Sequence, residues 1–277
     1  MAKPGKKPDP TREIKALWPS ADPERSAALL KALHVLTREG ALNQDSRRKL
    51  KQVLHLVQLL RPSIEEMLKE KAEPILADLG AGKSYLGFIL YDLILGPAGR
   101  GHVTGIESRD DLVTASRKLA AESGFTRMDF LAGPIAQANL PSGHADIVTA
   151  LHACDTATDE AIWFALRHEA KVIALVPCCQ AEVARLLEDK KGALDQLWRH
   201  PIQRREFGGH VTDVMRALFL ESHGYKVRVT ELVGWEHSLK NELILAERHQ
   251  RSNAMAKAAL DRLVDQLGVR PALLSDG

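Results

Sequence analysis

Cysteine and long apolar runs are both scarce in this chain of 277 residues. The three cysteines, Cys154, Cys178 and Cys179, are too few and too clustered for a disulfide framework, so a reducing cytoplasm is the expected compartment. No apolar run approaches the roughly 20 residues that a membrane helix needs. Residues 1–10 also lack the apolar core of a signal peptide. These absences predict a cytoplasmic protein with no membrane association.

Net charge is small as well, at +2, but it is unevenly distributed. Residues 1–70 hold fourteen Lys and Arg against nine Asp and Glu, an excess of five positive charges, which leaves −3 for the remainder. A basic segment beside a near-neutral remainder indicates a polyanionic partner such as RNA. A solvated helical surface is the more common explanation of such a charge run.

The first quarter of the chain has a helical pattern after a short tail. We expect residues 1–20 to form a disordered basic tail. Apolar residues then recur at helical spacing from Asp22 to Glu70, with a break at Gly40 to Asp45. Pro62 is expected to separate two helices. Residues 21–71 are therefore interpreted as an N-terminal helical cap.

Strand-like and helix-like segments alternate from Pro74 onward. The expected strands are Ile75–Leu79, His102–Glu107, Met128–Leu131, Asp146–Leu151, Val172–Val176, Lys226–Leu232 and Leu243–Glu247. The expected helices are Tyr85–Leu95, Asp110–Ser123, Asp159–Glu169, Gln180–Asp189, Val211–His223 and Ala254–Leu267. Such alternation implies a mostly parallel sheet that is covered by helices on both faces.

The last two expected strands have no helix-length segment between them, so they should pair antiparallel. We therefore predict an α/β fold of the Rossmann-like class for residues 72–249. Its seven-stranded sheet is mostly parallel with an antiparallel last strand. Residues 250–277 are expected to form a C-terminal helix and tail.

The most informative stretch is Ile75–Gly87, where an apolar run ends in Asp78 and a Gly-Ala-Gly turn leads into a helix-like run. A strand that turns through glycines into a helix lets backbone amides approach a ligand closely. The pattern Asp-x-Gly-x-Gly resembles the cofactor loop of Rossmann-like methyltransferases that use S-adenosylmethionine (SAM). The resemblance implies that Asp78, Gly80, Ala81 and Gly82 bind SAM.

The next two strand ends add chemistry that suits a nucleoside. Ligands of parallel sheets bind at the carboxyl ends of the strands. Glu107 ends the second strand and can accept hydrogen bonds from both ribose hydroxyls, while Ile135 follows the third strand and offers apolar surface for the adenine. Three consecutive strand ends with suitable chemistry favour a SAM site over a plain tight turn.

Two other nucleotide sites fit this loop less well. Gly82–Ser84 resembles the end of a phosphate-binding P-loop, but the first glycine of that motif would fall on Ala77. Asp78 would also place a carboxylate in the phosphate cradle. A dehydrogenase loop needs Gly-x-Gly-x-x-Gly, and Tyr85 occupies its third glycine position.

All three cysteines fall at the ends of predicted strands, where a methyltransferase binds its acceptor. The segments His152-Ala-Cys-Asp-Thr-Ala-Thr-Asp159 and Pro177-Cys-Cys-Gln180 resemble a methyltransferase-like family. This family includes the glutathione S-transferase C-terminal-domain-containing protein. A more distant similarity is to tRNA 2′-O-methyltransferases, which have a His-Leu-Cys-Gly segment at the matching strand end. The resemblance covers roughly Ser46–Glu247 and implies SAM binding on a Rossmann-like fold.

The cysteine segments admit several chemistries. Cys154, Cys178 or Cys179 could supply a thiolate that adds to C6 of a pyrimidine, or the thiols could simply pack around the pocket. His152 and Asp155 are the nearest candidates for a general base, and His152 could equally be a buried structural residue. Structural zinc ligands are usually spaced by two to four residues, which these are not, so no metal is expected.

Substrate contacts are expected from basic side chains outside the cofactor loop. Arg204 and Arg205 lie near Trp198 in a predicted loop, a combination that suits phosphate contact with base stacking, although a solvated loop is the alternative. Asn241 resembles part of a Thr-x-Lys-Asn segment of the family, which implies pocket lining, and a turn role would explain it equally well. The expected substrate-binding residues are Arg47, Arg48, Lys49, Arg204, Arg205 and Asn241.

Together these patterns predict a SAM-dependent methyltransferase whose favoured substrate is RNA, either tRNA or rRNA. One alternative is methylation of a protein side chain or a small molecule. Another is a non-catalytic protein that binds SAM or RNA.

Overall fold

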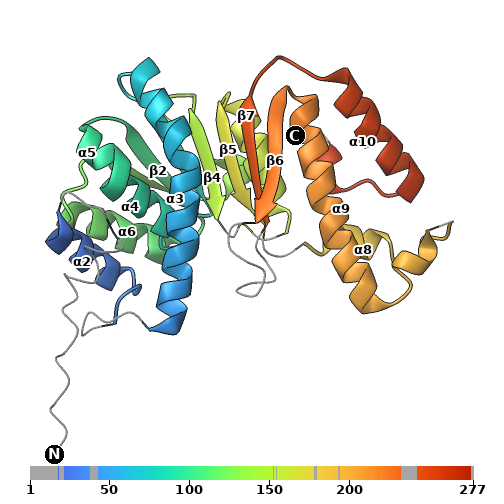
Figure 1. The fold of residues 1–277 in the computed structure, drawn as a ribbon, viewed down its shortest axis with the longest axis horizontal. Helices are drawn as coiled ribbons and strands as arrows, with labels where there is room; N and C mark the ends of the chain where they lie inside the picture. The colour runs from blue at the N-terminus through green and yellow to red at the C-terminus, as the bar shows by residue number, and fades with distance from the viewer. Residues whose placement is uncertain are drawn as a thin grey trace, which may run out of the picture.

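The computed structural model describes Trp18 and residues 22–37, 43–151, 153, 155–177, 180–192, 194–231 and 242–275. Within these residues the strands form one seven-stranded sheet in the order β3-β2-β1-β4-β5-β7-β6 (Figure 1). The strands are β1 (Ile75–Leu79), β2 (His102–Glu107), β3 (Met128–Ala132), β4 (Ile147–Leu151), β5 (Val172–Val176), β6 (Tyr225–Glu231) and β7 (Glu242–Arg248). β7 runs antiparallel to β5 and β6, and the remaining pairings are parallel. The predicted fold is confirmed, with the last strand antiparallel.

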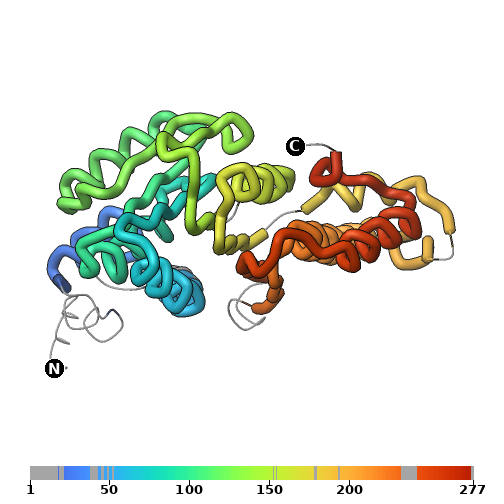
Figure 2. The backbone as a smooth tube through the Cα atoms, turned by 90° about the horizontal axis from the view of Figure 1, so that it is seen from above, coloured from blue at the N-terminus to red at the C-terminus, as the bar shows by residue number. Residues whose placement is uncertain are grey.

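Helices cover both faces of this sheet. The α-helices are α2 (Pro23–Ala32), α3 (Gln44–Glu70), α4 (Tyr85–Leu90), α5 (Gly96–Ala98), α6 (Asp110–Glu122), α7 (Ala157–Arg167), α8 (Glu182–Leu186), α9 (Pro201–Ser222) and α10 (Ala254–Leu267). The shorter turns are the π-helical η1 (Tyr91–Leu95) and the 3-10 turns η2 (Ile135–Gln137), η3 (Asp195–Leu197) and η4 (Ala272–Leu274). Apolar residues of α2, α3, α4 and α6 share one core cluster, and those of α7, α9 and α10 share the other. Figure 2 shows the elongated outline, with α8, α9 and α10 at the end opposite α2. Within the described residues, none of the helices has both the length and the apolarity that crossing a membrane requires.

Helix α3 runs without interruption through Pro62, so the predicted division into two helices was wrong. Proline removes a backbone donor and favours a helix end, but packing outweighs this preference here. Leu60 and Ile64, on either side of the proline, are both buried, and the Ser63 hydroxyl donates to Glu247 of β7 over 2.9 Å. Burial on both sides of Pro62, together with the bond from Ser63 to β7, holds the helix together.

One buried carboxylate of η1 binds the segment that precedes α3. Asp92 of η1 is fully buried and accepts hydrogen bonds from the indole of Trp18 at 3.0 Å and the hydroxyl of Ser26 at 2.6 Å. Arg25 pairs with the same carboxylate at 2.7 Å. Trp18, which falls within the expected tail, is thus a core residue.

Helix α9 begins ten residues earlier than the sequence pattern indicated, because Pro201 occupies its first turn. Arg204 and Arg205 therefore lie on a helix and not in a loop. Trp198 is buried, stacks near Phe207 with 5.5 Å between ring centroids, and donates its indole N–H to the carbonyl of Lys190. The predicted use of this ring for base stacking was wrong.

Candidate active site

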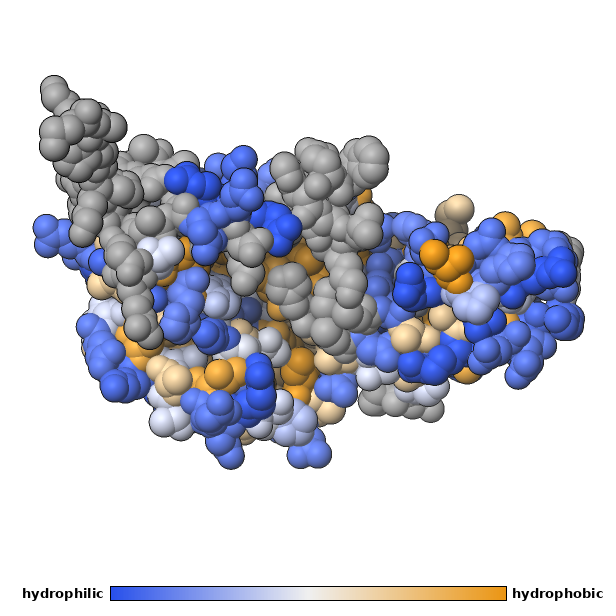
Figure 3. All heavy atoms as spheres, turned by 90° about the horizontal axis from the view of Figure 1, so that it is seen from below, coloured by the Kyte–Doolittle hydropathy of each residue, from blue (hydrophilic) through white to orange (hydrophobic). Residues whose placement is uncertain are grey.

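The strand order reverses between β1 and β4, since the chain proceeds from β1 to β2 and β3 on one side and continues with β4 and β5 on the other. Such a switch point leaves a crevice at the carboxyl ends of the strands. Helices α3 and α9 begin at this same edge, the lower one in Figure 1. Seen from that edge, apolar atoms gather in the middle, between hydrophilic surfaces on either side (Figure 3).

The loop after β1 has a left-handed backbone at alternate residues. Gly80 has φ +58°, Gly82 has φ +56° and Ser84 has φ +51°. Glycine adopts this conformation without strain, which explains its presence at the first two positions. The N–H of Ala81 donates to the carbonyl of Ile106 over 3.0 Å, so the loop folds toward the end of β2.

Asp78 supports this loop from below. Its two oxygens accept hydrogen bonds from the hydroxyls of Ser84 and Thr149, each at 2.9 Å, and the residue is 2% exposed. Burial raises the pKa of Asp78 to about 6, and the two hydroxyls limit the rise. The carboxylate faces Ser84 and Thr149 and so supports the loop, and the predicted contact of Asp78 with the cofactor stays a prediction. Gly87 permits this packing, since a side chain there would meet the Ser84 hydroxyl at 2.6 Å.

Glu107 faces the loop from β2. One carboxylate oxygen accepts from the N–H of Gly82 at 2.7 Å, and the other accepts from the N–H of Arg109 at 3.1 Å and from the Ser108 hydroxyl at 3.2 Å. Burial by itself would raise the pKa of Glu107, but the N–H donors of Arg109 and Gly82 outweigh it and hold the pKa below its usual range. The carboxylate is therefore ionised at neutral pH.

An ionised carboxylate offers about four acceptor positions. The oxygen that faces Gly82 makes one of these contacts and can accept one ribose hydroxyl without rearrangement. The other oxygen also accepts from the Arg109 side chain, which is 63% exposed. Glu107 thus fits the predicted ribose role.

Apolar contacts complete the cofactor side of the crevice. A side chain at Gly80 would lie 3.8 Å from Ile135 and 3.9 Å from Ala153, so three separate connections converge at this point. An open glycine backbone, an ionised carboxylate and an apolar wall match the amino-acid, ribose and adenine parts of SAM. The residues present fit this cofactor.

Asp155 contacts the start of α8. It has φ +51°, and one carboxylate oxygen accepts from the N–H groups of Ala181 and Glu182 at the start of α8. Arg185 pairs with the other oxygen at 3.2 Å. Burial would raise the pKa of Asp155, but the N–H of Ala181 and the Arg185 side chain lower it below its usual range. This carboxylate therefore caps α8, and its predicted role as a general base stays a prediction.

The remaining acceptor-side predictions lie outside the described residues and stay predictions. They are His152, Cys154, Cys178, Cys179 and Asn241, together with the side chain of Lys49. In the part of the chain that the structure describes, no group of three metal-ligating side chains comes together.

The predicted substrate-binding arginines lie on two helices that begin at the crevice edge. Arg47 and Arg48 are exposed in the first turns of α3. Arg204 pairs with Glu188 at 2.6 Å and is 17% exposed, whereas Arg205 is exposed. Of the second pair, Arg205 is the side chain that points to solvent.

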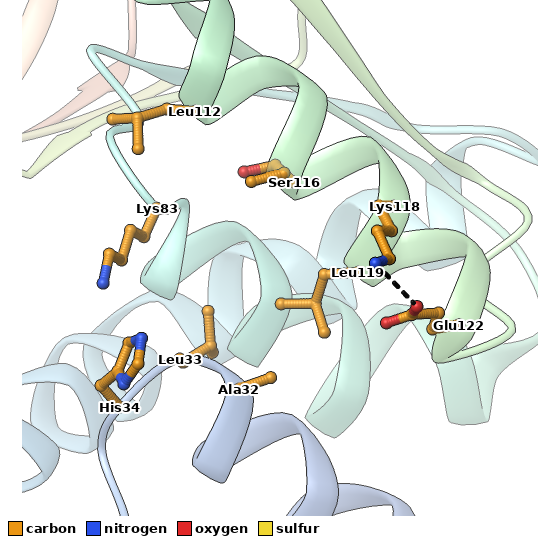
Figure 4. A pocket seen from close by; sticks show the side chains of 10 residues that line it. Ala32, Leu33, His34, Lys83, Leu112, Ser116, Lys118, Leu119 and Glu122 are labelled. Atoms are coloured by element: carbon orange, nitrogen blue, oxygen red, sulfur yellow. Dashed lines mark ion pairs between the residues drawn. The ribbon is translucent and has the colours of Figure 1, made fainter.

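A cavity of about 280 Å³ lies where α2, the loop after β1 and α6 meet (Figure 4). Leu33, Leu112 and Leu119 form its apolar part, and His34 and Lys83 lie at its rim. Lys118, which also lines it, is paired with Glu122 at 3.7 Å. None of the crevice residues Gly80, Glu107 and Ile135 lines this cavity, so it is a separate feature.

Sequence reasoning missed Thr149 and Arg109 as partners of the two key carboxylates. Thr149 was detectable, since it is a polar residue within an otherwise apolar strand. Arg109 gave no such signal, because an arginine after a strand is common on protein surfaces.

Comparison with known proteins agrees with the geometry. Residues 48–186, half of the chain, match the model of a family described as "Methyltransferase domain". The mouse (Mus musculus) glutathione S-transferase C-terminal domain-containing protein is 27% identical over 237 residues, which are 76% of this chain and 35% of that protein. The chain therefore spans about a third of the length of this relative, and the resemblance inferred from the cysteine segments is confirmed.

Among solved structures, the magnesium protoporphyrin IX methyltransferase of Synechocystis PCC 6803 with bound S-adenosylhomocysteine (SAH) has a TM-score of 0.46 and 13% identity. The match covers 81% of this chain and 93% of that one. An rRNA methylase of Streptococcus thermophilus has a TM-score of 0.43 and 12% identity, covering 65% of this chain and 89% of that one.

Proposed function

Because this chain belongs to the methyltransferase-domain family, we propose that it uses SAM to transfer a methyl group to RNA in the cytoplasm. The observation that carries this proposal is the glycine loop after β1, which is folded onto an ionised Glu107 at the switch point of the sheet. SAM supplies an electrophilic methyl group when it is bound.

The cofactor unit comprises residues 72–249 in this proposal, and residues 21–71 extend its edge. Glu107 holds the ribose, the backbone of Gly80–Gly82 approaches the amino-acid part, and Ile135 with Ala153 covers the adenine. Asp78 acts indirectly, by holding Ser84 and with it the loop.

The acceptor is placed over the ends of β4 and β5. Since the cofactor carries the reactivity, the chain needs only to orient the acceptor and to take up a proton. The candidate bases from the sequence are His152 and Asp155, of which Asp155 is engaged at α8. Cys154, Cys178 and Cys179 remain candidates for a thiolate or for packing.

RNA as the acceptor is supported by charge at the crevice edge. Arg47 and Arg48 on α3 and Arg205 on α9 lie at the starts of two helices that cover opposite faces of the sheet. A polyanion that crosses the crevice would contact both groups.

The test is methyl transfer from tritiated SAM to total RNA and to total protein from cells that lack this enzyme, with SAH binding measured by calorimetry. We expect label in RNA and heat with SAH. Label in protein or in a small-molecule fraction would replace RNA by that acceptor. SAH binding without transfer to any fraction would favour a non-catalytic binder, and a well-folded protein without SAH binding would refute the cofactor site.

A further inference from the structure

Arg216 of α9 is a charged residue with almost no solvent contact. It is 1% exposed and pairs with two carboxylates, Asp159 of α7 at 2.7 Å and Asp213 of its own helix at 3.1 Å. Buried ion clusters contribute little net stability, because apolar residues of similar size often replace them without loss. Stability alone therefore does not account for this cluster, and its contacts with the backbone indicate another role.

The cluster holds the chain that follows β4. The Arg216 guanidinium donates to the carbonyl of Asp155 over 2.8 Å. The backbone of Asp155 has φ +51°, a conformation that is strained for any residue other than glycine. The Thr158 hydroxyl donates to the carbonyl of Ala153 over 2.7 Å. The carbonyls on both sides of position 154 are thus held by buried donors.

The same cluster holds the chain that follows β5. Asp213 accepts a hydrogen bond from the side-chain amide of Gln180, directly after position 179. The carboxylate of Asp155 accepts from the N–H groups of Ala181 and Glu182. The two strand ends are therefore bound both to Arg216 and Asp213 and to each other.

We propose that Arg216, Asp213 and Gln180 are positioning residues that set the geometry of the two segments after β4 and β5 for the acceptor. This inference rests on the proposed function for the statement that the acceptor binds there. It assigns a role to a cluster outside the cofactor crevice.

The charge of this cluster changes near neutral pH. Asp213 faces Arg216 and Gln180, with Asp159 of α7 on the other side of Arg216 and Glu242 of β7 nearby, and Glu242 is in turn paired with His210 at 3.4 Å. Burial raises the pKa of Asp213 to about 7, Arg216 opposes the rise and Glu242 adds to it. Above that pH the two carboxylates of Asp159 and Asp213 face the single guanidinium of Arg216, so the cluster has excess negative charge.

Thiol alkylation tests the inference directly, because all three cysteines of the chain lie in these two segments. Iodoacetamide labelling of each cysteine is followed by mass spectrometry in Arg216→Met, in the milder Gln180→Ala and in a control, Arg127→Met. Arg127 also donates to two backbone carbonyls, those of Leu95 and Gly101, but at the opposite edge of the sheet.

We expect labelling rates to rise at least about fivefold in Arg216→Met and Gln180→Ala, since removing the donors lets the segments open locally. The rates should be unchanged in Arg127→Met, and SAH affinity should stay within about twofold of wild type in all three. In wild type the rates, after division by the thiolate fraction that a free model thiol shows at each pH, should still change between pH 6 and 8, and Asp213→Asn should remove that remaining change.

Unchanged labelling in both Arg216→Met and Gln180→Ala, or an equal rise in Arg127→Met, would overturn the positioning role. Failure of the proposed function is distinguishable, because it appears as absent methyl transfer in wild type while the labelling differences persist.

Discussion

Asp78, Glu107 and Asp155 each lie at or beside the end of a strand, yet their surroundings shift their pKa values in different directions. Asp78 is enclosed with two hydroxyls and has a raised pKa, whereas N–H donors lower the pKa of Glu107 and of Asp155. Backbone N–H groups can only donate and therefore stabilise the ionised form more than the neutral one, while hydroxyls can also accept from a protonated carboxyl group. The carboxylate that remains charged and lies beside the crevice is Glu107.

Glu107→Gln should weaken SAH binding at least about tenfold, because it replaces a charged acceptor by a neutral amide. Calorimetry measures the affinity, and thermal unfolding checks that the variant is folded. Glu73→Gln is the matched control, since Glu73 also accepts a glycine N–H, that of Gly101, at the amino edge of the sheet. Equal loss of affinity in both variants would show that Glu107 has no specific contact.

Asp78→Asn should change the pH dependence of stability. The raised pKa of Asp78 means that its stabilising contribution is complete below its ordinary value of 3.8 and is lost as the pH rises toward 6. A shift of this size corresponds to at most roughly 3 kcal/mol. Asparagine keeps an acceptor for Thr149 and a donor for Ser84 and does not ionise.

The free energy of unfolding of Asp78→Asn in urea should therefore exceed that of wild type above pH 6, and the difference should vanish near pH 4. Asp129→Asn, at a carboxylate 74% exposed and paired with His102 at the surface, should show no such trend. A constant difference at every pH would contradict the buried ionisation.

At the scale of elements, α8 and α9 approach so closely that one glycine is required. A side chain at Gly208 would meet the backbone nitrogen of Ala184 at 2.7 Å, whereas one at the neighbouring Gly209 would meet nothing within 4 Å. This contact matters for the site, because α8 is the helix that Asp155 caps.

Adjacent substitutions in α9 should consequently have opposite effects. Gly208→Ala should lower the free energy of unfolding by about 1–3 kcal/mol, because backbone cannot move away as a flexible side chain can. Gly209→Ala should raise it by up to about 1 kcal/mol through helix propensity. Urea unfolding of both variants measures the pair, and a shared sign would refute the close approach.

At the scale of the molecule, the sheet order brings the starts of α3 and α9 to one edge although about 150 residues separate them. This arrangement places basic side chains on both flanks of the crevice. RNA binding should then depend on both flanks, even though each is an ordinary helix start by itself.

Arg205→Glu and the double change Arg47→Glu with Arg48→Glu should each weaken RNA retention on filters about tenfold at low salt, with a smaller effect as salt increases. Arg100→Glu, at an exposed position at the amino edge of the sheet, should change retention much less. Equal retention by all variants at low salt would exclude an RNA path along this edge.

Local patterns were sufficient for the strands, most of the helices and the glycine loop. β1, β2, β5 and α10 have the predicted bounds, because periodicity and turn chemistry are properties of neighbouring residues. They were insufficient for α3, where the packing of Leu60 and Ile64 continues the helix through Pro62. They were also insufficient for α9, which begins at Pro201, soon after the buried Trp198, and not at Val211 as predicted.

The distribution of roles among the polar residues depended on the folded chain. The bond from Thr149 to Asp78 joins residues 71 apart, and that from Arg216 to Asp155 joins residues 61 apart. Such partners meet only when the sheet order places β4 beside β1 and when packing brings α9 against the segment that follows β4. A motif can therefore indicate a cofactor loop after β1, but burial and hydrogen bonding across the sheet decide that Glu107 faces the loop as a charged carboxylate while Asp78 holds Ser84 and Thr149 and Asp155 caps α8.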